Sequence, residues 1–204
     1  MRIFGIDPGS ERTGYGCVET DGRRHQLVTC GAIAAQAGDD FPGRLAHIHR
    51  ELSSLLASCK PDCVAIENLF HAKNVRSALK LGHARGVAML AAVQAGCPVA
   101  EYTPAEIKRA VVGYGRAEKH QVGQMVKLLL GLDAAPSPHD AADALAVAIC
   151  HMHSAPPTAL TDLTTKADLK VGLYASKGRD TLVEADLQVR LQKSWRQYRP
   201  PTTG

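Results

Sequence analysis

The sequence predicts an α/β protein with a mixed sheet of five strands and helices on both faces. Residues 1–33 contain three short strand patterns separated by turns, and the residues that follow alternate between helical periodicity and short apolar runs. Strands joined by tight turns pair in antiparallel fashion, whereas strands separated by helices pair in parallel. The length of 204 residues and the 45% apolar content suit one folded core with an extension.

The first three strands are predicted to form a meander. Residues 1–7 alternate and end at Asp7-Pro8-Gly9, a turn sequence. Residues 14–19 read as a second strand, and Asp21-Gly22 marks a hairpin turn before a third strand at 26–33.

Helices and strands then alternate. Apolar residues recur at helical spacing over residues 41–59, and the apolar run 63–66 suits a strand buried on both faces. Thr103, Pro104 and Glu106 form a helix-start signal. The remaining predicted elements are a helix at 75–95, a strand at 98–102, and helices at 104–111, 118–130 and 140–152.

The pattern predicts a folded domain at residues 1–153 and a C-terminal extension at 154–204, partly ordered or disordered. The extension opens with the linker-like Ser154-Ala155-Pro156-Pro157 and lacks clear periodicity. Its eight basic and five acidic residues, with Trp195 and Tyr198 near the last basic ones, suit either a nucleic-acid contact or a surface segment. We expect it to be dispensable for chemistry.

Several classes of protein are disfavoured. No stretch approaches about 18 consecutive apolar residues, and the N-terminus lacks the features of a secretory signal, so we expect a cytoplasmic protein without a membrane partner. Six cysteines without a C-x-x-C pair predict reduced core residues. Between residues 73 and 127 the net charge is +6, which favours a polyanionic partner.

Four carboxylates stand where charge is unfavourable. Asp7 and Glu67 end apolar strands, and Asp140 and Asp143 share one face of an apolar helix. Each has an ordinary explanation as a turn, capping or helix-dipole residue. Together they predict a cluster that only a cation can neutralise, and oxygen ligands favour Mg²⁺. Two such ions would activate water for in-line attack on a phosphodiester.

Four segments resemble the RuvC family of bacterial Holliday junction resolvases. They are IFGIDPGSERTGYG, AIENLFHAKNVRSALKLGHARGVA, VVGYGRAEKHQV and HDAADALAVAI, and together they run through most of residues 1–153. The resemblance implies a ribonuclease H-like (retroviral integrase superfamily) fold. It also implies a homodimeric endodeoxyribonuclease that resolves four-way DNA junctions by paired symmetric nicks, leaving 5′-phosphate and 3′-hydroxyl ends.

The resemblance also assigns roles to residues. Asp7, Glu67, Asp140 and Asp143 become the catalytic metal ligands, for two Mg²⁺ ions that Mn²⁺ can replace. Phe70 becomes a residue that stacks on opened bases. The resemblance implies further DNA contacts at Lys73, Arg76, Arg85, Lys108 and Lys119. It also implies two protein partners, the branch-migration proteins RuvA and RuvB. His139 is left as either a solvated residue or an aid to the site.

Other functions stay open at this point. A YqgF-type resolvase or an RNA-strand nuclease would share the fold, a scaffold protein would keep only the basic surface, and an actin-like ATP-binding protein would share the IDPGS turn. The Asp140 and Asp143 pair favours the RuvC interpretation. Finally, the long helix 75–95 carries surplus apolar surface and is expected to form the dimer contact, through Ala78, Leu79, Leu81, Ala84, Ala88 and Ala91.

Overall fold

The computed structural model describes residues 1–35, 38–68 and 74–154, which all belong to one compact unit. Its five strands form one sheet in the order β3-β2-β1-β4-β5. β1 pairs with β2, and β2 with β3, in antiparallel fashion; β4 pairs in parallel with both β1 and β5. The mixed sheet is therefore confirmed. The strands are β1 (Arg2–Asp7), β2 (Arg12–Thr20), β3 (His25–Ala34), β4 (Cys63–Glu67) and β5 (Val99–Tyr102).

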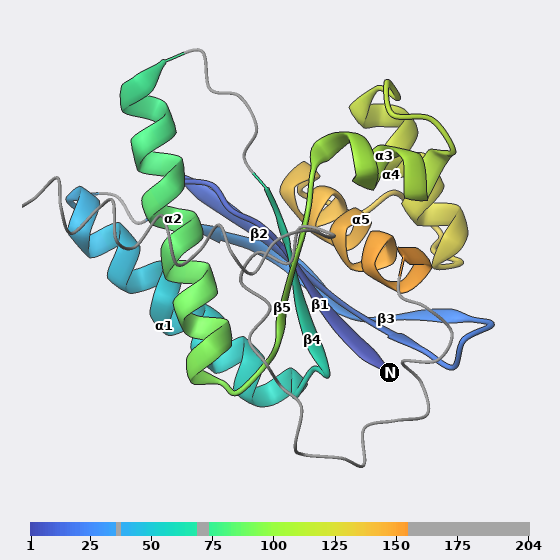
Figure 1. Cartoon of the computed structure of the whole chain (residues 1–204), viewed down its shortest axis with the longest axis horizontal. Helices are drawn as coiled ribbons and strands as arrows, with labels where there is room; N and C mark the ends of the chain where they lie inside the picture. Colours follow the sequence, from blue (N-terminus) through green and yellow to red (C-terminus); the bar gives the residue numbers. More distant parts are fainter. Residues whose placement is uncertain (36–37, 69–73, 155–204) are drawn as a thin grey trace, which may run out of the picture. The chain divides into compact units, whose positions relative to one another are not determined.

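Helices cover both faces of this sheet (Figure 1). α1 and α2 pack on one face of the sheet, and α3, α4 and α5 pack on the other. One hydrophobic core therefore lies on each side of the strands. All five predicted helices are present, with ends that differ from the prediction by at most two residues. They are α1 (Phe41–Cys59), α2 (Val75–Gln94), α3 (Pro104–Val112), α4 (Lys119–Leu129) and α5 (His139–Ser154).

The helix starts follow local chemistry. The Thr103 hydroxyl accepts a hydrogen bond from the Glu106 backbone N–H, and the Glu106 carboxylate accepts one from the Thr103 N–H, which completes the predicted capping box of α3. Asp40 caps α1 through the Gly43 N–H, and a proline follows within the first turn.

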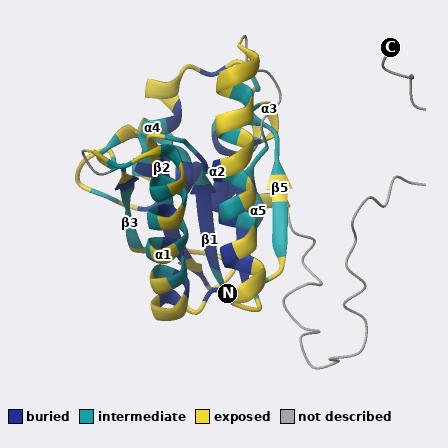
Figure 2. Cartoon of the chain, turned by 90° about the vertical axis from the view of Figure 1, so that its left-hand side faces the viewer, coloured by how far each residue is buried: buried dark blue, intermediate teal, exposed yellow. Residues whose placement is uncertain are grey.

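The centre of the sheet and α5 form the most buried part of the molecule. The first four residues of β4 are buried, as expected for a strand covered on both faces. Nine of the 16 residues of α5 are also buried, mostly alanines. The strands at the centre of the sheet are dark blue in Figure 2, whereas the outer sides of the helices are yellow. Small residues let α5 lie close to the strands, and this closeness decides where its acidic residues stand.

Glycines on the strands make that close packing possible. A Cβ atom at Gly5 of β1 would overlap the backbone carbonyl oxygen of Ala144, and a Cβ at Gly14 of β2 would overlap that of Asp140. Glycine is the one residue that allows backbone to approach backbone in this way. The N-terminal turn of α5 therefore rests directly on the strand that pairs with β1.

The cysteines agree with the expectation of a reduced core. All six are free; Cys17, Cys59, Cys63 and Cys150 are buried, and the other two are half-buried. Within the described ranges, no helix is both long enough and apolar enough to cross a membrane. The predicted extension at 154–204 lies, apart from its first residue, outside the described residues, and its boundary stays a prediction.

Candidate active site

Asp7 and Glu67 meet at one edge of the sheet because they end neighbouring parallel strands. β1 and β4 pair in register through Ile6 and Ile66, the residues just before the two acids. Asp7 in turn pairs across to Gly14 of β2, the residue on which the Asp140 backbone rests. Two strands and one helix thus deliver the four predicted carboxylates to the same place.

The turn after Asp7 is fixed by a buried threonine. The Thr13 hydroxyl donates a hydrogen bond to the Gly9 carbonyl at 2.9 Å, and Thr13 is fully buried. This bond closes the loop between β1 and β2 directly after Asp7. The backbone that leaves Asp7 is consequently constrained by this loop as well as by the sheet.

Burial raises the pKa of both strand acids, although the hydrogen bond with Glu67 acts to lower the pKa of Asp7. Loss of solvent is the main cause for Asp7, whose side chain shares a hydrogen bond with Glu67. Burial, followed by the charge of Asp7, raises the pKa of Glu67 to about 8. At neutral pH without a cation, Glu67 therefore keeps a proton and shares it with Asp7.

Two basic side chains face the helix acids. The Lys119 ammonium donates a hydrogen bond to the Asp143 carboxylate at 2.9 Å, and this bond raises the pKa of Lys119. The guanidinium Nε of Arg12 lies 4.0 Å from the Asp140 carboxylate. The site thus holds a proton on the strand side and an ammonium group on the helix side.

The donor set suits a hard divalent cation. In this arrangement no three His, Cys, Asp or Glu side chains of the described part converge as ligands to one ion. The excess negative charge is instead offset by the retained proton and by Lys119. A cation that binds carboxylate oxygens would take over this role, and so the residues fit a divalent metal.

The predicted DNA-contact residues are distributed differently. Arg76 is exposed in the first turn of α2, and Lys108 is half-buried on α3. Arg85 is half-buried and forms an ion pair with Glu101. Phe70 and Lys73 lie outside the described residues, and His139 is exposed at the first position of α5.

Arg12 is a site residue that the sequence did not single out. Its one signal is its place in the segment that follows Asp7, and surface arginines are too common for that signal to decide. The contact of Lys119 with Asp143 was likewise not predicted, because the two residues lie on different helices.

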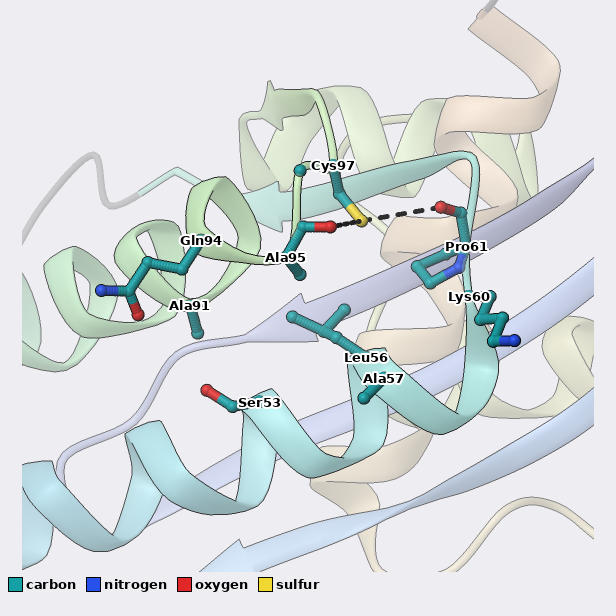
Figure 3. A pocket seen from close by; sticks show the side chains of 10 residues that line it. Ser53, Leu56, Ala57, Lys60, Pro61, Ala91, Gln94, Ala95 and Cys97 are labelled. Atoms are coloured by element: carbon teal, nitrogen blue, oxygen red, sulfur yellow. Dashed lines mark hydrogen bonds between the residues drawn. The ribbon is translucent and has the colours of Figure 1, made fainter.

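A separate cavity of about 640 Å³ lies between the C-terminal ends of α1 and α2 (Figure 3). Leu56, Ala57, Ala91 and Gln94 line it, and the Cys97 thiol contacts the Pro61 carbonyl beside it. These residues precede β4 and β5, whereas Asp7 and Glu67 stand at the opposite ends of their strands. The cavity is therefore not part of the acidic site.

The sheet order, the helices on both faces and the acids at the sheet edge define a nuclease of the ribonuclease H-like class. Comparison with known proteins narrows this class. The family described as "Crossover junction endodeoxyribonuclease RuvC" matches residues 3–151. The chain belongs to this family.

Individual relatives agree. The crossover junction endodeoxyribonuclease RuvC of Geobacter sp. (strain M21) is 56% identical over 160 residues, 78% of this chain and 97% of the relative. That of Koribacter versatilis is 52% identical over 168 residues, 82% of this chain and the whole of the relative. Thermus thermophilus RuvC in complex with Holliday junction substrate superposes with a TM-score of 0.69 at 33% identity, covering 75% and 94% of the two chains.

The raised pKa of Glu67 gives a testable pH dependence. The folded chain binds more protons here than the unfolded chain, so without metal its stability falls as pH rises from about 4.5 to about 8. Between pH 5.5 and pH 8, the free energy of unfolding should fall by roughly 2 kcal/mol less in Glu67→Gln than in the wild type. Urea unfolding in EDTA at pH 5.5 and pH 8 measures it, with Glu51→Gln on the surface of α1 as control. An unchanged pH slope in the Glu67 variant would contradict the assignment.

Proposed function

We propose that this chain resolves four-way DNA junctions by paired symmetric nicks that leave 5′-phosphate and 3′-hydroxyl ends. The observation that carries the proposal is the placement of Asp7 and Glu67 at one sheet edge beside the first turn of α5, in a chain that matches the family over residues 3–151. The solved complex of the Thermus relative with Holliday junction substrate supports the choice of DNA.

Asp7, Glu67, Asp140 and Asp143 would hold the divalent metal, which we propose to be two Mg²⁺ ions that Mn²⁺ can replace. When bound, metal supplies a water nucleophile and stabilises the leaving oxygen. The chain itself supplies the buried acids and keeps them in place through the Thr13 loop and the α5 packing. Because the pKa of Glu67 is raised to about 8, binding of a cation would require loss of its proton, and metal affinity is expected to rise with pH.

Lys119 has the position to contact substrate as well as acid. Its side chain is 79% exposed although its ammonium touches Asp143. A DNA phosphate that approaches the acids therefore meets this positive charge first, which offsets their repulsion. We assign Lys108 and Arg76 to the same DNA surface, with Phe70 stacking on opened bases and Lys73 and Arg85 near phosphates.

One experiment separates this proposal from its alternatives. The protein is incubated with a labelled four-way junction, a matched linear duplex and an RNA–DNA hybrid, each with Mg²⁺ or with EDTA. We expect Mg²⁺-dependent cleavage of the junction at two symmetric positions, and ligase should reseal the nicks. Cleavage of the hybrid alone would indicate an RNA-strand nuclease, and binding without cleavage would indicate a scaffold protein.

A homodimer is part of the proposal, because paired nicks in a two-fold junction need two identical sites. α2 carries a stripe of exposed apolar residues; Val75, Leu79, Leu90 and Val93 are each more than half exposed. Gly82 and Gly86 lie along the same stripe, with open space where a Cβ would stand. A second copy packing on this face would bury the stripe and approach closely at the glycines.

The structure corrects the residues expected at this contact. Ala84, Ala88 and Ala91 are buried within this copy, so they cannot form the contact. They recur at intervals of four and three residues and mark the inner face of the helix. Leu79, also expected at the contact, is on the exposed face.

Leu90→Asp tests the dimer. Leu90 is 51% exposed, so the charge should leave the fold of one copy intact while weakening association by at least about tenfold. Sedimentation at micromolar concentration should show a shift from dimer to monomer, with loss of paired nicks. Val28→Asp, at an exposed apolar residue of β3, is the matched control. A Leu90 variant that stays dimeric would refute this contact.

The remaining partner and location proposals rest on family membership alone. We propose that the protein works with the branch-migration proteins RuvA and RuvB in the cytoplasm.

A further inference from the structure

Two histidines far apart in the sequence meet away from the acidic site. His25 begins β3, and His153 lies in the last turn of α5. Their Nε2 atoms are 3.3 Å apart, and their ring centroids are 5.4 Å apart with an interplanar angle of 47°. The rings therefore do not stack but meet through their Nε2 edges.

The hydrogen bonds of the other ring nitrogens fix where the protons lie. Nδ1 of His153 is 3.0 Å from the Ala110 carbonyl oxygen, which can only accept, so this Nδ1 carries a proton. Nδ1 of His25 is 3.0 Å from the Thr20 hydroxyl. That hydroxyl already donates its proton to the Arg24 carbonyl, so it accepts from His25.

Both imidazoles consequently turn a lone pair on Nε2 toward each other. Two facing lone pairs repel unless a proton or a metal ion lies between them. A proton between them would make one ring a cation, and charge-assisted hydrogen bonds are short, about 2.7–2.9 Å when the acceptor is an oxygen. Two imidazole nitrogens bound tetrahedrally to one zinc ion at about 2.0–2.1 Å lie about 3.3–3.4 Å apart. The observed separation matches the second case.

The surroundings also favour a metal ion over a bridging proton. Burial, followed by the neighbouring His153, lowers the pKa of His25, so this imidazole resists protonation. The acid whose charge acts on His25 is Asp21, and its carboxylate already accepts hydrogen bonds from the backbone N–H groups of Arg23 and Arg24. The bonds from Nδ1 to a carbonyl and to a hydroxyl are the outer contacts that orient metal-binding histidines.

We propose that Nε2 of His25 and Nε2 of His153 bind one zinc-class transition-metal ion. Imidazole nitrogens select Zn²⁺, Ni²⁺ or Cu²⁺ over Mg²⁺, so this site is distinct from the acidic one. No third His, Cys, Asp or Glu of the described part completes the site, so water fills the other positions. The ion would tie the start of β3 to the end of α5 and would stabilise the folded chain.

Zinc binding can be measured on the full chain without any DNA. We expect added Zn²⁺ to raise the melting temperature by about 3 °C or more in excess Mg²⁺, which on the proposed function occupies the acidic site. Competition with a chromophoric chelator should show one Zn²⁺ that is lost from His25→Gln and from His153→Gln. Each single variant should lose the whole increment, and the double variant should lose nothing more.

His49→Gln is the matched control. His49 lies on α1, on the other face of the sheet, and its imidazole forms a hydrogen bond with the Gln94 side chain of α2. A plain hydrogen bond between the histidines would lower the melting temperature of the variants equally in EDTA and in Zn²⁺. Such equal lowering, or a zinc increment that survives in either variant, would overturn the proposal. Junction cleavage in Mg²⁺ is an independent readout, so failure of one proposal leaves the other intact.

Discussion

Asp7→Asn is expected to abolish junction cleavage while junction binding persists. The asparagine side chain keeps the size of the aspartate but removes one of two buried strand charges that would hold metal. Loss of an outer contact to a metal ligand already costs about 10–100-fold, so loss of a ligand should lower the cleavage rate by at least about 100-fold in Mg²⁺. Binding relies mainly on basic residues and should stay the same or tighten.

Rate and affinity are to be measured separately for this variant, by single-turnover cleavage in Mg²⁺ and by gel shift in EDTA. Asp143→Asn should show the same loss of cleavage and the same retained binding, and it also removes the ion pair of Lys119 with Asp143. Asp133→Asn, on exposed surface, is the control. Cleavage by the Asp7→Asn variant at a rate near that of the wild type would end the assignment of these acids.

Gly14→Ala is the second change with a large expected effect. The added methyl group would overlap the Asp140 carbonyl, so the start of α5 must move away from β2. Overpacking of this kind costs about 1–3 kcal/mol of stability. A misplacement of about 1 Å costs about 100-fold in rate, and so cleavage should fall even in protein that remains folded.

Gly123→Ala provides the contrast, because a Cβ there meets open space on helix α4. That variant should be as stable as the wild type or up to about 1 kcal/mol more stable. Urea unfolding and single-turnover cleavage would be compared for the two glycines. Unchanged cleavage by Gly14→Ala would show that the acids of α5 tolerate displacement of their helix.

Much of this architecture was predictable because local signals agreed with the fold. The capping box at Thr103 predicted the start of α3, apolar periodicity predicted α1, and Asp7-Pro8-Gly9 predicted a strand end. The acids could be grouped because parallel strands end at the same edge. What joins them across elements, such as the contact of Lys119 with Asp143, depends on tertiary packing and leaves no local pattern.

The faces of α2 illustrate the same limit. Periodicity showed that the helix has apolar residues around much of its circumference, but not which stripe meets the sheet. His151 and His153, near the end of α5, each have a partner that no local pattern indicates: Tyr102 for the first and His25 for the second. Those partners come from β5 and β3, on opposite edges of the sheet.

The glycine contacts beneath α5 have a consequence for how this site can vary. Where side chains separate a helix from a sheet, exchanging leucine for valine changes their spacing in small steps. Here main chain lies on main chain at Gly5 and Gly14, so the spacing is set by atomic radii that no substitution can shorten. The distance between the acids of the strands and the acids of α5 is therefore fixed by backbone contact. Different junction sequences must therefore be accommodated by the DNA and by exposed side chains such as Lys119.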